Sequence, residues 1–280
     1  MCLPGTVETV REQVGEEGPT HINRRAALLG GAGVGLGAAF PRVASATRGR
    51  KTARRFQDLT HTFTAGFPVF VPGTEPERET IAEYATDGFY AQRWTFGEHA
   101  GTHMDAPGHF VPGARMSPQI TPRELLVPIV VVDISRKAQR DPDAMVEVYD
   151  LVRFERSHGR IPEGALVAMD SGWAGKVDDP LEFKGGEMFP NYHFPGFSQG
   201  AARWLLRRRH VSAIGVDTLS LDPGNSTTFP VHVDLLSADR YGLENLANLD
   251  RIPPQGATAY VGVIPWEQGS GGPCRVIAAW

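Results

Sequence analysis

Three histidines and one aspartate fall within eleven consecutive positions, and this cluster constrains the fold more than any other feature of the sequence. They are His99, His103, Asp105 and His109. In an extended strand, His99 and His103 would lie ~13 Å apart at ~3.3 Å per residue, which is too far for both to bind one ion. The chain must therefore fold back between them, and Gly101 lies where that bend is needed.

The residues around the cluster predict a loop or a bulged strand. The spacing of His99 and His103 would also suit one face of a helix, but a glycine between them and the Pro107-Gly108 pair after them disfavour a helix. Imidazole and carboxylate ligands suit Zn(II), Mn(II) or Fe(II), and the cluster has no cysteine, which argues against a closed structural zinc site. An open site binds water, so the cluster predicts catalysis rather than loop histidines that only form hydrogen bonds.

The first 46 residues have the features of an export signal. Asn23-Arg24-Arg25 precedes a glycine-rich, weakly apolar stretch over 26–40, and Ala44-Ser45-Ala46 offers a peptidase site. Paired arginines are typical of the twin-arginine class of signals. A membrane anchor is the alternative, but a span needs about 20 strongly apolar residues. We expect residues 1–46 to be an export signal, 47–55 a flexible basic leader, and 56–280 the catalytic domain of a periplasmic or extracellular protein.

The charge and the cysteine content limit the kinds of partner that the protein can bind. The net charge is -4, and no long run of one sign occurs, so the chain lacks the basic patch of a nucleic-acid binder. Cleavage after Ala46 would leave Cys274 as the only cysteine, so the mature protein would have no internal disulfide. It would also remove the apolar stretch over 26–40, so we expect no stable membrane insertion of the mature protein. We therefore expect a small-molecule substrate.

Apolar runs in the mature chain predict an α/β fold. Four short runs, each bounded by glycine, proline or aspartate, read as buried strands at 128–134, 165–169, 211–216 and 257–264. Ser198 can cap a helix over 200–209 that ends in arginines, which suit the negative end of the helix dipole. The segment 183–197 is rich in glycine, proline and aromatic residues, and it predicts a long loop that covers a pocket.

The pattern His99-x-Gly-Thr-His103-x-Asp105-x-Pro-x-His109 resembles the signature of the metal-dependent cyclase family, which includes bacterial kynurenine formamidase and isatin hydrolase. The resemblance implies that His99, His103 and Asp105 bind a metal ion, that Asp105 bridges to a second ion where there are two, and that His109 transfers protons. The family completes its site with a later histidine and a glutamate twelve positions after it, which here are His232 and Glu244.

The resemblance continues through 68–73, 171–173, 215–218 and 222–223, and it carries further implications. The fold would be the family's swivelling β/β/α domain, a single catalytic domain with a mixed sheet, and the protein would be a homodimer or homotetramer. The cofactor would be one or two divalent ions, Zn or Mn. A bound ion would activate water to attack a carbonyl carbon.

Two departures from the family pattern concern the substrate. Phe70 stands where kynurenine formamidases carry a tryptophan that contacts the substrate, and Val233 follows His232 where many members have a polar residue. The sequence therefore predicts a hydrolase of a carbon–nitrogen bond in a small aromatic or cyclic amide, with Phe70 against the substrate. Two alternatives stay open: a lactone hydrolase, cyclase or dehydratase of secondary metabolism, and a secreted metal- or ligand-binding protein without turnover.

Overall fold

The computed structural model describes residues 55–280, so the predicted export signal and nearly all of the predicted leader lie outside the described part of the chain. In that part, no helix has both the length and the apolar character needed to cross a membrane. The strands are β1 (Phe56–Asp58), β2 (Glu77–Ala82), β3 (Ala91–Thr95), β4 (His103–Asp105), β5 (Leu126–Asp133), β6 (Met145–Val146), β7 (Leu166–Asp170), β8 (Gly196–Phe197), β9 (Ala213–Val216), β10 (Tyr241–Glu244), β11 (Ala257–Val263) and β12 (Gly271–Ala279). The helices are α2 (Tyr84–Asp87), η1 (Pro107–His109), η2 (Ser117–Gln119), α3 (Ser135–Ala138), α4 (Val148–His158), η3 (Trp173–Lys176), α5 (Pro180–Lys184), α6 (Gln199–Arg209), α7 (Pro230–Ser237) and η4 (Leu249–Arg251).

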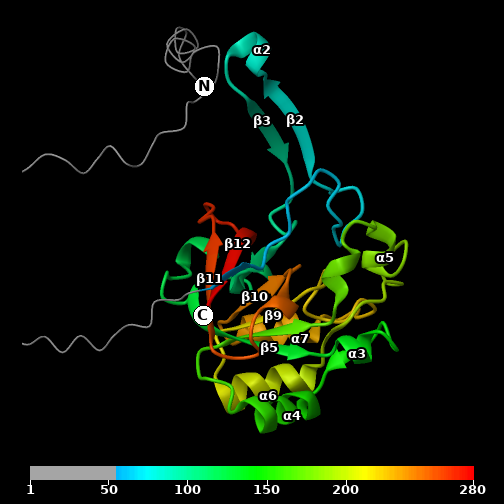
Figure 1. Cartoon of the computed structure of the whole chain (residues 1–280), viewed down its shortest axis with the longest axis vertical. Helices are drawn as coiled ribbons and strands as arrows, with labels where there is room; N and C mark the ends of the chain where they lie inside the picture. The colour runs from blue at the N-terminus through cyan, green and yellow to red at the C-terminus, as the bar shows by residue number, and fades with distance from the viewer. Residues whose placement is uncertain (1–54) are drawn as a thin grey trace, which may run out of the picture. The chain divides into compact units, whose positions relative to one another are not determined.

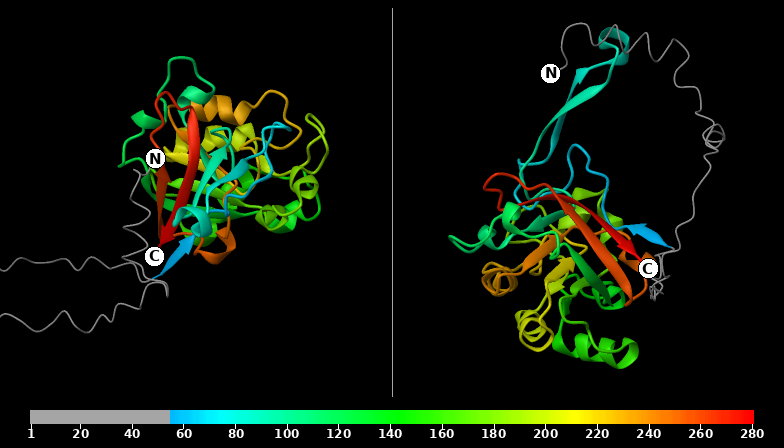
Figure 2. Two further views of the ribbon diagram at one scale, coloured as in Figure 1. Left: turned by 90° about the horizontal axis from the view of Figure 1, so that it is seen from above. Right: turned by 90° about the vertical axis from the view of Figure 1, so that its left-hand side faces the viewer.

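A mixed sheet organises the described part of the chain, as predicted. Its strand order is β1-β12-β11-β5-β7-β9-β10-β4, and an additional pairing of β12 with β4 closes all of these strands except β1 into a barrel. Strands β5, β7, β9 and β10 are parallel, whereas β1, β4, β11 and β12 pair antiparallel with their neighbours. The four predicted strands correspond to β5, β7, β9 and β11. The long strands β11 and β12 run side by side in the right-hand view of Figure 2.

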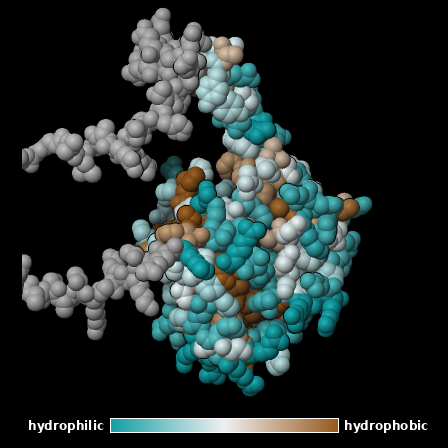
Figure 3. Space-filling view, in the orientation of Figure 1, coloured by the Kyte–Doolittle hydropathy of each residue, from teal (hydrophilic) through white to brown (hydrophobic). Residues whose placement is uncertain are grey.

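The parallel strands are buried on both faces, which explains why they read as continuous apolar runs. In β5, Ile129 and Val131 point into the barrel, while Val130 and Val132 pack against residues of the helices. Helices α4, α6 and α7 cover this outer face (Figure 1). On the side of the molecule seen in Figure 3, apolar residues reach the surface only in small patches between polar ones.

Helix α6 begins where the sequence predicted. The side chain of Ser198 accepts a hydrogen bond from the Ala201 backbone N–H, and three arginines occupy the last turn. His210 ends the helix in the left-handed conformation, with φ of 51°. The chain then enters β9, which lies parallel to β7, so this segment is a β–α–β crossover of the kind that joins parallel strands.

The predicted long loop over 183–197 is only partly a loop. Helix α5 takes in its first two residues and β8 its last two. Phe183, Tyr192 and Phe194 are fully buried, and they form a small core of their own with Trp173 and Leu219. Three large aromatic side chains have enough apolar surface to nucleate such a core, so the aromatic residues of this segment pack on one another and on neighbouring segments.

Residues Arg78–Arg93 form a compact unit separate from the rest of the described chain. In this unit, β2 and β3 make a two-stranded hairpin with α2 at its tip. An ion pair between Arg93 and Glu79 joins the two strands. Tyr84 and Tyr90 stack near the tip with ring centroids 5.9 Å apart. These two contacts hold the hairpin unit together.

Arg115 connects three segments of the chain by ion pairs, and its removal should change the pH dependence of stability. Its guanidinium contacts Glu124 through two nitrogens at 2.8 and 3.1 Å and Asp239 at 2.7 Å. The hydrogen bonds from Arg115 lower the pKa of Glu124 to about 2, from 4.5. Because the folded-state pKa is depressed, this stabilisation is present above pH 4.5 and is lost as the pH falls toward 2.

We expect Arg115→Ala to destabilise the protein by about 1 kcal/mol at pH 7, the upper range for a partly exposed ion pair. The difference between variant and wild type should shrink between pH 4.5 and 2. Urea unfolding of both proteins across this range measures it. A difference that stays constant with pH would show that the alkyl chain of Arg115, rather than the ion pair, provides the stabilisation.

Candidate metal centre

The turn predicted between His99 and His103 is present at Gly101. This residue has φ of 68°, in the left-handed region that favours glycine, and a Cβ there would lie 2.4 Å from the ring of Phe63. The carbonyl of Gly101 accepts a hydrogen bond from Nδ1 of His103 at 2.9 Å. The bend therefore returns the chain toward the site and also orients one of its histidines.

Strand β4 positions two of the side chains. His103 and Asp105 are two residues apart, so they share one face of the strand, while Met104 points into the barrel core. Glu244, on the neighbouring strand β10, is the direct register partner of His103. Strand pairing thus places a residue from the far end of the sequence beside the histidine cluster.

Helix α7 supplies His232, and Asp222 holds the start of this helix. The carboxylate of Asp222 accepts hydrogen bonds from the backbone N–H groups of Val231 and His232 at 2.9 and 3.1 Å. It also contacts Nδ1 of His232 at 2.7 Å. Because one carboxylate fixes both the backbone and the ring, Nε2 of His232 is the nitrogen left to face the site.

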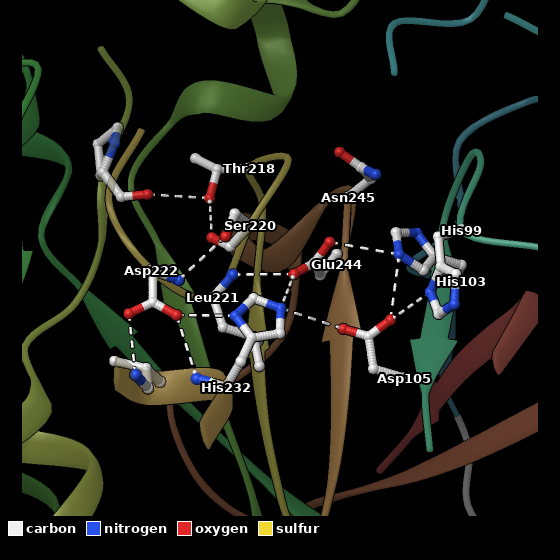
Figure 4. Close-up of polar contacts among 12 residues, drawn as sticks. His99, His103, Asp105, Thr218, Ser220, Leu221, Asp222, His232, Glu244 and Asn245 are labelled. Carbon is white, nitrogen blue, oxygen red and sulfur yellow. Dashed lines mark hydrogen bonds and ion pairs between the residues drawn. The ribbon is translucent and has the colours of Figure 1, made fainter. Parts of the chain in front are cut away.

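The five predicted metal-binding residues meet in two groups that share Asp105 (Figure 4). The first group is His99, His103 and Asp105, and the second is Asp105, His232 and Glu244, with donor atoms within 4.8 Å of one another in each. Asp105 lies 2.7 Å from Nδ1 of His99, and Nε2 of His232 lies 3.0 Å from Glu244. Within residues 55–280, these are the only places where three such donors converge.

The donor atoms fit a divalent ion. Nε2 of His103 and Oδ2 of Asp105 are completely buried without a hydrogen-bond partner among the described residues, which is costly unless another group satisfies them. Nε2 of His103 lies 3.3 Å from Glu244 and 3.4 Å from Asp105. Imidazole nitrogens and carboxylate oxygens together suit Zn(II) and Mn(II). The orphaned atoms therefore indicate a metal centre.

The electrostatics of the centre point the same way. Burial by itself lowers the pKa of His103, but the carboxylates of Asp105 and Glu244 outweigh burial and raise it to about 10. The pKa of His232 is also raised, since Asp105, Asp222 and Glu244 together outweigh its burial. The carboxylates thus hold positive charge at the centre in the form of protons, which a divalent ion would replace on binding.

His109 lies beside the metal-binding residues but belongs to neither donor group. Its ring stacks on that of His99, with centroids 3.8 Å apart and planes 25° from parallel. Burial is the main reason that the pKa of His109 falls to about 4. The ring is therefore neutral near pH 7 and can accept a proton, as the predicted proton carrier must.

Phe70, which was predicted to contact the substrate, lies in an aromatic cluster. The ring of Phe229 lies between Phe70 and the metal-binding residue His232. Phe229 packs edge-on between Phe70, at 5.8 Å, and His232, at 5.9 Å. Phe110 stacks on His232 at 4.8 Å. The rings nearest the centre are thus Phe110 and Phe229, which the sequence did not single out for a site role by motif. Phe110 directly follows His109, and Phe229 precedes His232 by three residues. Their closeness in the sequence to predicted site residues was the one signal that could have found them.

Comparisons with known proteins identify the family of this chain. The family model described as "Putative cyclase" matches residues 57–223. The chain is 35% identical to isatin hydrolase of Roseibium aggregatum over 224 residues, which cover 75% of this chain and 84% of the relative. It is 25% identical to kynurenine formamidase of Erythrobacter litoralis, over 81% of this chain and 94% of that protein. The solved structure of isatin hydrolase A from Ralstonia solanacearum superposes with a TM-score of 0.76 at 35% identity, covering 80% of this chain and 91% of the other.

Proposed function

This chain belongs to the cyclase family, and on that basis we propose that it is a metal-dependent hydrolase that cleaves the carbon–nitrogen bond of a small aromatic or cyclic amide. The observation that carries the proposal is the pair of donor groups sharing Asp105, with the neutral ring of His109 stacked beside them. The relatives named isatin hydrolase and kynurenine formamidase support an amide as the substrate class.

The metal-binding residues would be His99, His103 and Asp105 for one ion, and Asp105, His232 and Glu244 for a second. A bound divalent ion supplies two effects, a lower pKa for water and stabilisation of negative charge on the carbonyl oxygen. The ligand types allow either Zn or Mn. We favour Mn, because an exported protein that folds and is loaded inside the cell can retain an ion that binds more weakly than zinc.

His109 would carry the proton of the reaction. Hydrolysis adds the oxygen of one water to the carbonyl carbon, breaks the carbon–nitrogen bond and moves one proton from water to the leaving nitrogen. The ring of His109 is neutral and lies against His99, so it can take the proton from water and then give it to the nitrogen. A protein that only bound metal would have no need of such a base, which disfavours the binding-protein alternative.

The aromatic surroundings favour a flat substrate. Phe110 and Phe229 border His232, and Phe70 and Phe189 continue the same cluster, with ring centroids 5.2 Å apart. An aromatic amide placed among these rings would gain the stacking energy of an aromatic pair, about 0.5–1.5 kcal/mol each beyond area burial. We propose that Phe70 contributes to this surface through Phe229.

Three further predictions complete the proposal. We expect the domain to be the swivelling β/β/α type of the family and to assemble as a homodimer or homotetramer. We also expect export by the twin-arginine route, based on Arg24-Arg25 and on the Ala44-Ser45-Ala46 cleavage site. Fractionation of cells that produce the full chain, with N-terminal sequencing of the mature protein, tests the last of these.

The function is tested by activity that depends on added metal. Protein stripped of metal with a chelator should hydrolyse none of a panel of N-formyl arylamines, cyclic imides, isatin and lactones. Adding back Zn(II) or Mn(II) should restore hydrolysis of at least one amide. Restored activity on lactones alone would favour the lactone hydrolase, and metal binding without any hydrolysis would favour the binding protein.

A further inference from the structure

Ser270 touches the metal centre from outside every motif in the sequence. It immediately precedes β12, and its hydroxyl oxygen lies 2.8 Å from Nε2 of His99. The other ring nitrogen of His99, Nδ1, lies 2.7 Å from Oδ1 of Asp105. We propose that Ser270 is a positioning residue, which holds His99 with Nδ1 directed toward the metal ion. This inference rests on the proposed metal centre.

The three histidines of the centre do not present the same nitrogen. Nδ1 of His103 is bonded to the carbonyl of Gly101, and Nδ1 of His232 is bonded to Asp222, so both rings offer Nε2. His99 offers the other nitrogen, Nδ1, because its Nε2 is hydrogen-bonded to Ser270. Each histidine thus has one partner behind it, as metal-binding histidines usually do, and the partner selects the nitrogen that binds.

His99 depends on its partner more than the other two histidines do. Its side chain is 25% exposed, whereas those of His103 and His232 are 3% and 5% exposed. His99 also lies outside regular secondary structure, before the turn at Gly101, so neither a strand nor a helix limits its ring. The hydroxyl oxygen of Ser270 accepts a hydrogen bond from Nε2–H and leaves the lone pair of Nδ1 free for a metal ion.

The segment around Ser270 is built to receive the ring of His99. A Cβ on Gly271 would lie 2.6 Å from Cε1 of His99 and 2.2 Å from the carbonyl oxygen of Met104, so the ring packs where only glycine leaves room. The backbone N–H of Ala106 donates to the carbonyl of Ser270 at 2.9 Å. Gly271 N–H donates to Glu98 at 3.2 Å.

These backbone bonds would hold the segment when the hydroxyl is removed. Ser270→Ala should therefore leave the fold intact and change only the contact with His99. Its effect on metal binding then reports on the position of the ring rather than on the stability of the chain.

The test is metal affinity in matched variants of the chelator-stripped protein, measured by titration calorimetry with Zn(II) and Mn(II). Ser270→Ala should weaken binding about 10- to 100-fold, the range for a lost partner of a ligating histidine. Ser270→Thr keeps a hydroxyl and should restore affinity to within a few-fold of wild type. Ser117→Ala is the matched control, because Ser117 is buried beside Gly269 of the same segment and its hydroxyl has no hydrogen-bond partner among the described residues.

A second readout addresses the nitrogen directly. Nitrogen-15 NMR of histidine-labelled, zinc-loaded protein should show His99 bound through Nδ1, and His103 and His232 bound through Nε2. Unchanged affinity in Ser270→Ala, equal losses in Ser117→Ala, or His99 bound through Nε2 would each overturn the inference. Wild-type protein that binds neither metal would refute the proposed metal centre itself, and this inference with it, whereas tight wild-type binding with an unaffected Ser270→Ala variant would refute this inference alone.

Discussion

Asp105→Asn is expected to lower the affinity for divalent metal by more than about 100-fold and to remove metal-dependent hydrolysis. Asp105 is the one residue common to both donor groups, with Oδ1 toward His99 and His103 and Oδ2 toward His232. An asparagine of the same shape keeps one oxygen but replaces the other with an amide NH₂ group, which cannot bind a cation. Loss of a partner behind a ligand already costs 10- to 100-fold, so loss of the shared ligand should cost more.

Calorimetric metal titration and thermal unfolding with and without metal measure this effect. In wild-type protein, metal at 100 times its dissociation constant should stabilise the fold by about 2.7 kcal/mol, whereas Asp105→Asn should gain almost nothing at the same concentration. Asp250→Asn is the control, because Asp250 is an exposed aspartate outside both donor groups. Wild-type affinity in Asp105→Asn would show that Asp105 is not a shared ligand, and the two-group description would have to be abandoned.

His109→Ala is expected to lower kcat by about 10²- to 10⁴-fold, the usual contribution of a positioned acid–base residue. Metal content should stay at the wild-type level, because His109 is in neither donor group and meets the centre only by stacking on His99. The variant thus separates proton transfer from metal binding, which Asp105→Asn does not. Steady-state kinetics and metal analysis of the same preparation provide both numbers.

The control for His109→Ala is His193→Ala. His193 is partly exposed and pairs with Asp143 at 2.9 Å, outside the metal centre, so its removal should leave kcat unchanged. A kcat of wild-type size in His109→Ala would exclude the proton-carrier role. Loss of metal together with activity would instead make His109 a ligand.

The fold was predictable where local sequence carried the information. Parallel strands that are buried on both faces need apolar residues throughout, so β5, β7 and β9 stood out as apolar runs, and the antiparallel strand β11 stood out by its β-branched residues. Ser198 predicted the start of α6, because a side-chain oxygen at this position can accept a hydrogen bond from one of the first backbone N–H groups of a helix. The segment over 183–197 was predicted wrongly as one long loop, because its first residues belong to helix α5 and its last to strand β8, and composition alone does not say how aromatic residues pack.

The sequence by itself determined the chemistry of the cluster formed by His99, His103, Asp105 and His109. The donor types of His99, His103 and Asp105 and the bend at Gly101 follow from side-chain identity and local backbone geometry, which act over a few residues. The tertiary structure decided how distant residues complete the centre. Register between β10 and β4 sets Glu244 beside His103, and the start of β12 brings Ser270 to His99. Such contacts depend on strand pairing across more than a hundred residues, and no local pattern in the sequence specifies that Ser270 meets His99.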